Sequence, residues 1–307
     1  MSEFRETLIG IAAVLASSAA FIFNDTCTKL ASAHLELGEI MVIRGLIAST
    51  IIVLVAWRFH AFAGWRAHLN VPLGWRTVGE VGAMVTYLVA LFNMPIANST
   101  AIMQAVPLMM TAAGAFFFRD QVGWRRWAAI TVGFGGILLI VRPGAEGFNL
   151  YSLLALAAAA SVTLRDLSTR RMPATTPTLF VTATTTVIVM LCGGVIALGQ
   201  LASGIAFRPV TAEAFLYLVG SAISVLAGYT LIIVAMRRGD TLTVAPFRYS
   251  QVLWAIVAGY LVWGDLPTLP TLLGIVIVVG SGIYMVHRER LRVAALRRSA
   301  LAPTPLP

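Results

Sequence analysis

The segment LIGIAAVLASSAAFIFNDTCTKL, Leu8 to Leu30, decides the class of this protein because its 23 residues form a nearly unbroken apolar run. A helix that spans a membrane needs about 20 such residues. The run is continuous and does not alternate at every second residue, which excludes a strand of a membrane β-barrel. No small-residue cleavage site followed by a soluble chain comes after it, so we expect a retained helix and not a removed signal peptide.

The rest of the chain repeats this pattern. Across the 307 residues 59% are apolar and 11% charged, with a mean hydropathy of +0.87, whereas soluble domains carry about 25% charged residues. Both cysteines, Cys27 and Cys192, fall inside apolar stretches and are expected to pack without forming a disulfide. The fold class predicted is therefore an all-α integral membrane protein with ten transmembrane helices, at about 8–30, 38–57, 77–94, 97–118, 127–141, 150–167, 178–198, 213–235, 242–263 and 269–286.

The boundary between the third and fourth runs depends on one short segment, Met94-Pro95-Ile96-Ala97-Asn98. It is either a bend within one long run or a tight turn between two helices. Proline interrupts a helix, and asparagine is a good helix-capping residue. We therefore predict a turn, with Asn98 as the cap.

The net charge of +9 comes from 22 Lys and Arg against 13 Asp and Glu. The basic residues are scattered between apolar runs, which argues against nucleic-acid binding and makes their distribution a signal of topology. With the N-terminus inside, 17 of the 22 fall on the cytoplasmic side, against Lys29, Arg142 and Arg208 outside and Arg44 and Arg248 within helices. This predicts cytoplasmic termini and a basic cytoplasmic tail over 288–307. The cytoplasmic set is Arg5, Arg58, Arg66, Arg76, Arg119, Arg125, Arg126, Arg165, Arg170, Arg171, Arg237, Arg238, Arg288, Arg290, Arg292, Arg297 and Arg298.

Two stretches of the chain resemble each other. Tyr87 precedes Met94 by seven residues, as Tyr229 precedes Met236, and a glycine-bearing run follows in each case. We interpret them as two five-helix units, residues 1–142 and 143–287. Because five is odd, the second unit would enter the membrane from the opposite side, which gives the inverted repeat that transporters use to build a midplane site. Chance similarity between apolar helices is the alternative.

The layout resembles the EamA-type branch of the drug/metabolite transporter superfamily over nearly the whole chain. The residues that carry the resemblance are Lys29 ending an aromatic-rich first helix, Arg44, Pro107, Asp120 after a phenylalanine run, and Trp263-Gly264-Asp265. Arg119-Asp120 departs from the family's usual Gly-Glu, and Tyr249 stands near an expected proline. The resemblance implies ten helices in two inverted repeats and a carrier of small organic molecules. Within the superfamily, the chain looks most like bacterial inner-membrane exporters of amino acids and related amphipathic metabolites, aromatic amino acids in particular.

Ionisable residues inside the first two runs are candidates for function, because a charge in a membrane helix is costly. Asp25 and Lys29 are four residues apart and share a helix face. Arg44 is the seventh residue of its run, roughly 10 Å below the outer surface at 1.5 Å per residue and at a depth similar to Asp25. We predict a charge network of Asp25, Lys29 and Arg44, with a purely structural ion pair as the alternative.

The ninth run carries Arg248, flanked by Tyr249 and Gln251, one turn from Pro246. Proline frees backbone groups, and interrupted helices commonly line cavities in membrane proteins. We predict that Arg248 and Tyr249 bind substrate. The alternative is an arginine that extends to the membrane surface.

Tyr87 and Tyr229 occupy matching positions in the two units, so an inverted repeat would place them on opposite walls of one cavity. Core packing is the alternative for both tyrosines. Trp254, Gln104 and Asn24 are weaker substrate-binding candidates, since membrane tryptophan often packs or anchors and glutamine often bonds a neighbouring helix.

Motifs of other protein classes are missing from the sequence: no GxxxxGK loop, no HExxH and no His/Cys cluster at metal spacing. We therefore expect no cofactor, no metal, no nucleic-acid partner and no enzymatic activity. The predicted function is a secondary transporter that works by alternating access, with a small-molecule substrate and membrane lipids as partners. Alternatives are a membrane-embedded enzyme and a channel-like or structural bundle; the internal twofold arrangement is compatible with a monomer.

Overall fold

The computed structural model describes residues 2–120, 122–142, 149–173, 175–238 and 244–301, and every regular element in these ranges is a helix. Seven helical segments within them are long and apolar enough to cross a membrane. The protein is thus an all-helical, multi-pass membrane protein. The elements are α1 (Ser2–Ala31), α2 (Leu37–Arg58), α3 (Trp65–His68), α4 (Val71–Asn93), α5 (Ile96–Met103), α6 (Val106–Phe118), α7 (Trp124–Val141), α8 (Tyr151–Arg170), α9 (Thr178–Ala202), α10 (Ala212–Arg238), the 3-10 helix η1 (Ala245–Tyr249), α12 (Ser250–Trp263) and α13 (Leu269–Leu301).

Each predicted run overlaps one or two of these helices, but several ends differ. Helix α4 begins at Val71, before the predicted start at 77, because Asn70 Oδ1 accepts a hydrogen bond from the Leu73 amide (2.9 Å). The turn at Pro95 is confirmed, since α4 ends at Asn93 and α5 starts at Ile96. Asn98 is not a cap, however: it lies inside α5, and its amide donates to the Pro95 carbonyl.

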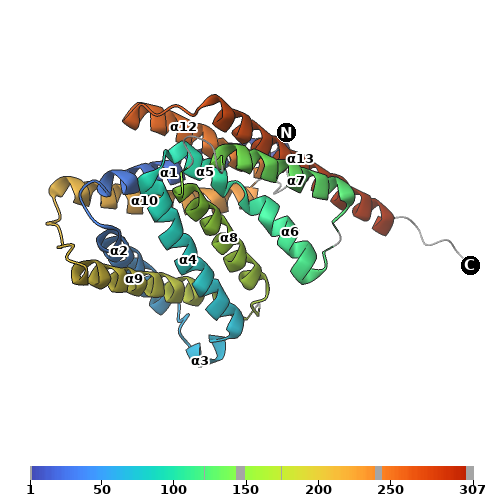
Figure 1. Ribbon diagram of the computed structural model, residues 1–307. Coiled ribbons are helices and arrows are strands. Elements are labelled where there is room, and N and C mark those ends of the chain that lie inside the picture. Colours follow the sequence, from blue (N-terminus) through green and yellow to red (C-terminus); the bar gives the residue numbers. More distant parts are fainter. Residues whose placement is uncertain (1, 121, 143–148, 174, 239–243, 302–307) are drawn as a thin grey trace, which may run out of the picture.

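Four pairs of long helices organise the molecule (Figure 1). Helix α1 packs along α10, α4 along α8, α2 along α9 and α7 along α13. Each pair joins one helix from residues before 142 with one from residues after 149. The shorter segments α5, α6, η1 and α12 pack against members of these pairs, so the two parts of the chain interlock.

Small residues let paired helices approach closely, as expected for the glycines of α7 and α13. A Cβ added to Gly274 would lie 2.6 Å from the Gly136 carbonyl oxygen, so these two backbones are in direct contact. Gly135 and Gly280 differ, because a Cβ at either position would meet no atom of the described residues within 4 Å.

Two interrupted helices break the regular pattern, each beside a proline. Helix α5 ends at Met103 and α6 begins at Val106, with Pro107 in its first turn. In the second half, Pro246 lies in the first turn of η1, ahead of α12. Proline lacks an amide hydrogen and leaves the carbonyl four residues earlier without its helical partner. Both prolines therefore stand where a helix is interrupted.

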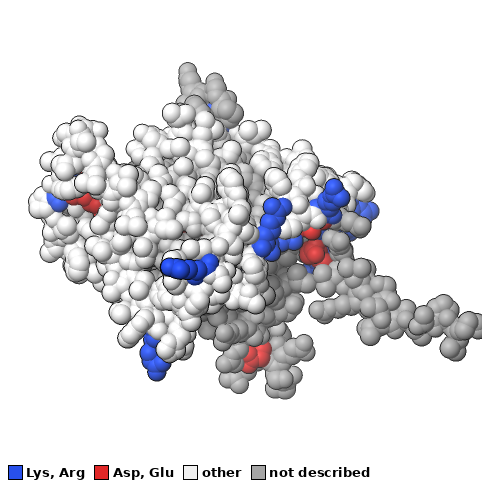
Figure 2. Space-filling model, turned by 90° about the horizontal axis from the view of Figure 1, so that it is seen from below, with Lys and Arg blue, Asp and Glu red and all other residues white. Residues whose placement is uncertain are grey.

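The described part of one face of the molecule is mainly uncharged (Figure 2). Figure 2 shows few Lys, Arg, Asp or Glu side chains on the described part of the face it presents, and most of them lie towards its margins. Large apolar side chains are exposed along the long helices, for example Leu54, Leu198 and Leu253. An exposed apolar surface of this kind is what lipid contact requires.

Candidate functional site

A cavity of about 580 Å³ lies where the two interrupted helices meet α1, α4, α8 and α10. Its volume is within the range of roughly 300–1,000 Å³ that is typical of small-molecule sites. Both parts of the chain contribute to its wall. We call it the central cavity; its lining residues are Phe21, Asp25, Tyr87, Thr100, Met103, Gln104, Val106, Pro107, Met110, Val162, Arg165, Asp166, Tyr229, Ala245, Arg248, Tyr249, Gln251 and Val286.

The two tyrosines that match in sequence line this cavity together. Tyr87 comes from α4 and Tyr229 from α10. The Tyr229 ring meets the Phe21 ring edge-to-face, with 5.2 Å between centroids. Aromatic faces of this kind can stack on a ring or attract a cation.

Asp25 is the centre of a hydrogen-bond network on one side of the cavity. The Tyr87 hydroxyl donates to Asp25 Oδ2 (2.6 Å), and Asn24 Nδ2 donates to Oδ1 (2.9 Å). Asn24 Oδ1 in turn accepts from Arg44 Nη2 (3.0 Å) and from the Ser221 hydroxyl (2.7 Å). Asn24 thus connects the carboxylate to Arg44, which makes no direct hydrogen bond to it.

Lys29 does not join this network, so the predicted triad of Asp25, Lys29 and Arg44 is not formed. Its ammonium donates to the Met94 carbonyl oxygen (2.5 Å) and lies 5.0 Å from the centre of the Trp263 ring. Although Lys29 and Asp25 share a helix face, the long lysine side chain extends away from Asp25 towards the end of α4. Lys29 therefore ties α1 to α4 and α12.

A second charged cluster joins α4 to α8. Arg165 Nε lies 2.8 Å from Asp166 Oδ1, and its Nη1 lies 3.5 Å from Glu80, which is also 3.5 Å from Arg76. Arg76 and Arg165 are predicted from the sequence to lie on the cytoplasmic side, but both lie inside helices, because α4 starts early and α8 continues to Arg170. The sequence signal for this cluster is the pair Arg165-Asp166 within one predicted span together with Glu80 within another.

Several polar groups around the cavity have no partner in the described ranges. The Tyr249 hydroxyl and Gln104 Nε2 are buried and make no hydrogen bond. Tyr249 is only 6% exposed and packs against Gly282, where a side chain would collide with its ring. The exposed Arg248 guanidinium also makes no ion pair with a described residue. A buried polar atom without a partner costs free energy, so the Tyr249 hydroxyl and Gln104 Nε2 are suited to a polar ligand. Arg248 offers a charged donor to the same cavity.

Two predicted substrate-binding residues lie off the cavity wall. Asn24 is 7% exposed and uses its amide within the network, so it positions Asp25 and Arg44. Trp254 is 40% exposed on α12 and does not line the cavity. A tryptophan is apolar enough to face lipid, which explains why an aromatic residue on a wall-forming helix need not point inward.

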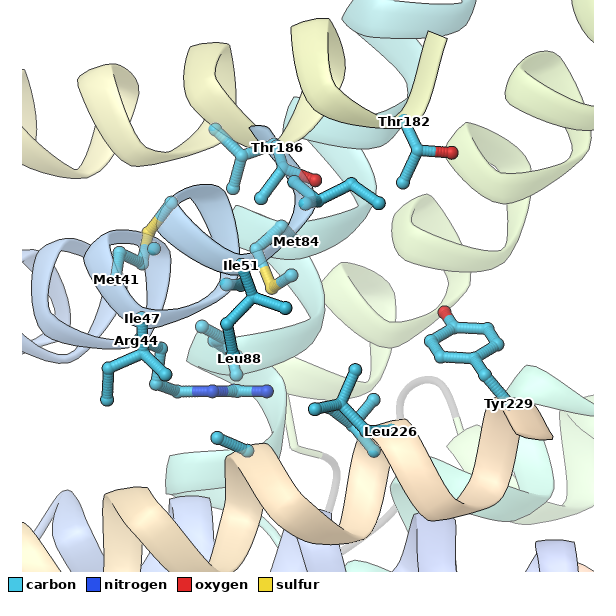
Figure 3. Close-up of a pocket in the computed structure, with 16 residues that line it drawn as sticks. Met41, Arg44, Ile47, Ile51, Met84, Leu88, Thr182, Thr186, Leu226 and Tyr229 are labelled. Atoms are coloured by element: carbon cyan, nitrogen blue, oxygen red, sulfur yellow. The ribbon is translucent and has the colours of Figure 1, made fainter. Parts of the chain in front are cut away.

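A second cavity, of about 240 Å³, adjoins the first between α2, α4, α9 and α10. Figure 3 shows the Arg44 side chain crossing it from α2 towards Leu226 on α10, with Tyr229 further along the same helix. The remaining wall is almost entirely apolar, with Thr182 and Thr186 as its hydroxyl groups. Tyr229 lines both cavities and so stands at their common boundary.

Comparison with known proteins gives consistent results. The EamA-like transporter family matches residues 8–142 and 149–287. A Rickettsia conorii protein named S-adenosylmethionine uptake transporter is 25% identical over 289 residues, covering 92% of this chain and 94% of that protein. A Vibrio cholerae protein named riboflavin transporter is 25% identical, covering 94% and 96%.

A Pseudomonas aeruginosa protein named pseudopaline exporter CntI is also 25% identical, covering 90% of this chain and 96% of its own. Among solved structures, one crystal structure is 19% identical with a TM-score of 0.55, covering 94% of this chain and 98% of that chain. It shares the fold. The named relatives include both uptake and export proteins.

Proposed function

The chain belongs to the EamA-like transporter family and is therefore a transporter of small metabolites, not an enzyme; from that premise we propose how it works and what it carries. It is a secondary transporter whose two halves expose the central cavity alternately to the two sides of the membrane. The halves are the five-helix units 1–142 and 143–287, ten spans in all, inserted in opposite directions.

The helix pairing supports this arrangement. The first helix of each half packs along the third helix of the other, as α1 does with α10 and α8 with α4. The second helices α2 and α9 pack together, and so do the fifth, α7 and α13. A twofold axis in the membrane plane would generate these pairings, and it relates the two proline-interrupted helices as well.

We place the protein in the bacterial inner membrane with both termini and the basic tail 288–307 in the cytoplasm. The 17 basic residues assigned to one side support this orientation, although Arg76 and Arg165 lie deeper than a loop would. A reporter active only in the periplasm, fused after residue 307, should be silent; activity there would contradict this orientation.

The proposed substrate is an amino acid or related amphipathic zwitterion with a flat ring, and the direction is export. The observation that carries this proposal is a pair of opposite charges on one wall: Asp25, whose direct partners are uncharged, and Arg248, which has no described ion-pair partner. A carboxylate of the substrate suits Arg248, an ammonium suits Asp25, and the rings of Tyr87 and Tyr229 suit an aromatic group.

The test is transport in proteoliposomes with labelled tryptophan, adenine and an organic cation as separate probes. We expect saturable counterflow of tryptophan, competition by phenylalanine and tyrosine, and at least a tenfold loss with Arg248→Ala. Flux that does not saturate would favour a channel. Counterflow of adenine or the cation but not of tryptophan would refute the amino-acid substrate and retain the transporter.

A further inference from the structure

Asp25 is a carboxylate in the interior of a candidate membrane span, Glu6–Ala31, and it lines the central cavity. A charged side chain inside a membrane helix is costly. Helix packing alone does not require this cost here, because hydroxyl and amide groups already join α1 to α10. The carboxylate itself therefore calls for a functional explanation.

The two aspartates of the cavity wall differ in their partners. Asp166 is held by Arg165 at 2.8 Å, so a cation already neutralises it. Asp25 receives hydrogen bonds from Tyr87 and Asn24, which are both uncharged. In the ranges that the structure describes, Asp25 is the aspartate of this wall that has no cation in direct contact.

The direct partners of Asp25 suit a group that gains and loses a proton. A tyrosine hydroxyl can donate to the ionised carboxylate and accept from the protonated one. Asn24 Nδ2 can donate to Asp25 Oδ1 in both states. Asn24 Oδ1 accepts from Arg44, so Arg44 is linked to Asp25 only through Asn24. Arg44 thus bonds Asn24 and leaves the position of an incoming cation at Asp25 open.

Other elements around Asp25 also present charged or titratable groups. Helix α4 contributes Tyr87, Arg76 and Glu80, and α8 contributes Arg165 and Asp166. The others are Tyr229 from α10, Arg248 and Tyr249 from η1, and Arg44 from α2. The carboxylates among these groups, Glu80 and Asp166, are paired with arginine. Asp25 is thus the carboxylate of this set that is open to a new cation.

We propose that Asp25 is an exchange site at which a proton and the cationic group of the substrate bind in alternation, so that substrate and proton move in opposite directions. When the ammonium group arrives, the Asp25 O–H bond breaks, the proton leaves to cavity water and the carboxylate pairs with the ammonium. On the other side the steps reverse. For a zwitterion each cycle moves one proton against one neutral substrate, and so transfers one positive charge.

This inference rests on the proposed function, and the first experiment tests the coupling directly. Proteoliposomes containing the wild-type protein and a trapped pH indicator receive labelled tryptophan on the outside. Inward tryptophan flux should make the lumen more alkaline, and an imposed gradient, lumen acidic, should accumulate tryptophan at least tenfold. Asp25→Asn should pass tryptophan only down its own gradient, with the accumulation lost. Tryptophan flux without proton movement in the wild type would overturn the exchange site and leave the transporter standing.

A second measurement needs no substrate. Infrared difference spectra of the purified protein should show a carboxylic C=O band that appears as the pH falls, is lost in Asp25→Asn and shifts in Asp25→Glu. The matched control is Asp120→Asn, which removes a surface carboxylate paired with Arg170 and should keep the band. If the wild type shows no such band, the proposal is wrong. If it shows the band but carries no tryptophan, the exchange site stands and the proposed substrate fails.

Discussion

The pair α1–α10 and the pair α4–α8 each join a helix from before residue 142 with one from after residue 149, yet they are held together by different chemistry. Across α1–α10 the bonds are neutral: Ser17 donates to the Gly228 carbonyl (2.8 Å), and Ser221 donates to Asn24 (2.7 Å). Across α4–α8 the bond is ionic, between Arg165 and Glu80. In the α1–α10 pair the acidic residue Asp25 stays accessible. In the α4–α8 pair Glu80 and Asp166 are both paired with Arg165.

The contrast is sharpest at two aspartates. Asp25 follows Phe21 by four residues and Asp166 follows Val162 by four, and all four side chains line the central cavity. The residue before each aspartate differs: Asn24 precedes Asp25, whereas Arg165 precedes Asp166. The neutral Asn24 leaves Asp25 available for ligands, whereas Arg165 pairs with Asp166 and also bonds Glu80 of α4. We expect mutations in α4–α8 to affect stability most and mutations around α1–α10 to affect transport most.

The largest effect should come from removing the cation that holds α4 to α8. Arg165→Ala leaves Asp166 and Glu80 without this partner. Breaking a buried ion pair costs 3–5 kcal/mol, and we expect about 3 kcal/mol because these side chains are partly exposed. Thermal unfolding in detergent should show the loss. Asp25→Asn is the matched comparison and should lower the Tm much less; an equal shift would remove the distinction between the two pairs.

Arg248 should show the largest effect on transport without an effect on folding. Arg248→Ala removes a charged donor that has no described ion-pair partner, so we expect a loss of about 2 kcal/mol of substrate binding, roughly 30-fold. Arg248→Lys keeps the charge but loses the planar fork and should recover only part of it. Normal tryptophan counterflow in both variants, at wild-type protein levels, would remove Arg248 from the site.

A matched pair of tyrosine variants sharpens the comparison further. The Tyr87 hydroxyl bonds Asp25 at 2.6 Å, whereas the Tyr229 hydroxyl has no hydrogen-bond partner within the described ranges. Tyr87→Phe should therefore reduce transport about fivefold, the equivalent of about 1 kcal/mol, and Tyr229→Phe should be tolerated. Replacement of either by Ala should lose aromatic substrates selectively. Equal effects of the two Phe variants on transport would contradict a specific role of the Tyr87 hydroxyl.

The smallest effect should come from the neutral contacts of α1–α10. Ser221→Ala removes the hydroxyl that bonds Asn24 and Thr28. Hydrogen bonds between membrane helices contribute about 0.6 kcal/mol on average, so the thermal stability should fall only slightly. A destabilisation as large as that of Arg165→Ala would show that the neutral pair is as rigid as the ionic one.

Each predicted apolar run overlaps a helix, and the break at Pro95 could be predicted because proline removes a backbone donor. Tyr87 and Tyr229 could be placed in one cavity because each precedes a methionine by seven residues. The direction of a long side chain could not be predicted: Lys29 shares a face with Asp25 but extends to Met94. The roles of Arg165 and Asp166 could not be predicted, because the sequence near a helix end does not show whether an arginine faces the cytoplasm or a cavity.

Alternate opening of the central cavity to the two sides of the membrane is tested most directly by chemical labelling. In a chain with Cys27 and Cys192 replaced by Ala, a single cysteine is placed at Met103, on the cavity wall beside the break between α5 and α6. Leu253→Cys, at a position 63% exposed on the outer face of α12, is the control. With a membrane-impermeant maleimide, Met103→Cys should react in right-side-out and in inverted vesicles, and Leu253→Cys in neither. Reaction of Met103→Cys from one side only, or from neither, would contradict alternating access through this cavity.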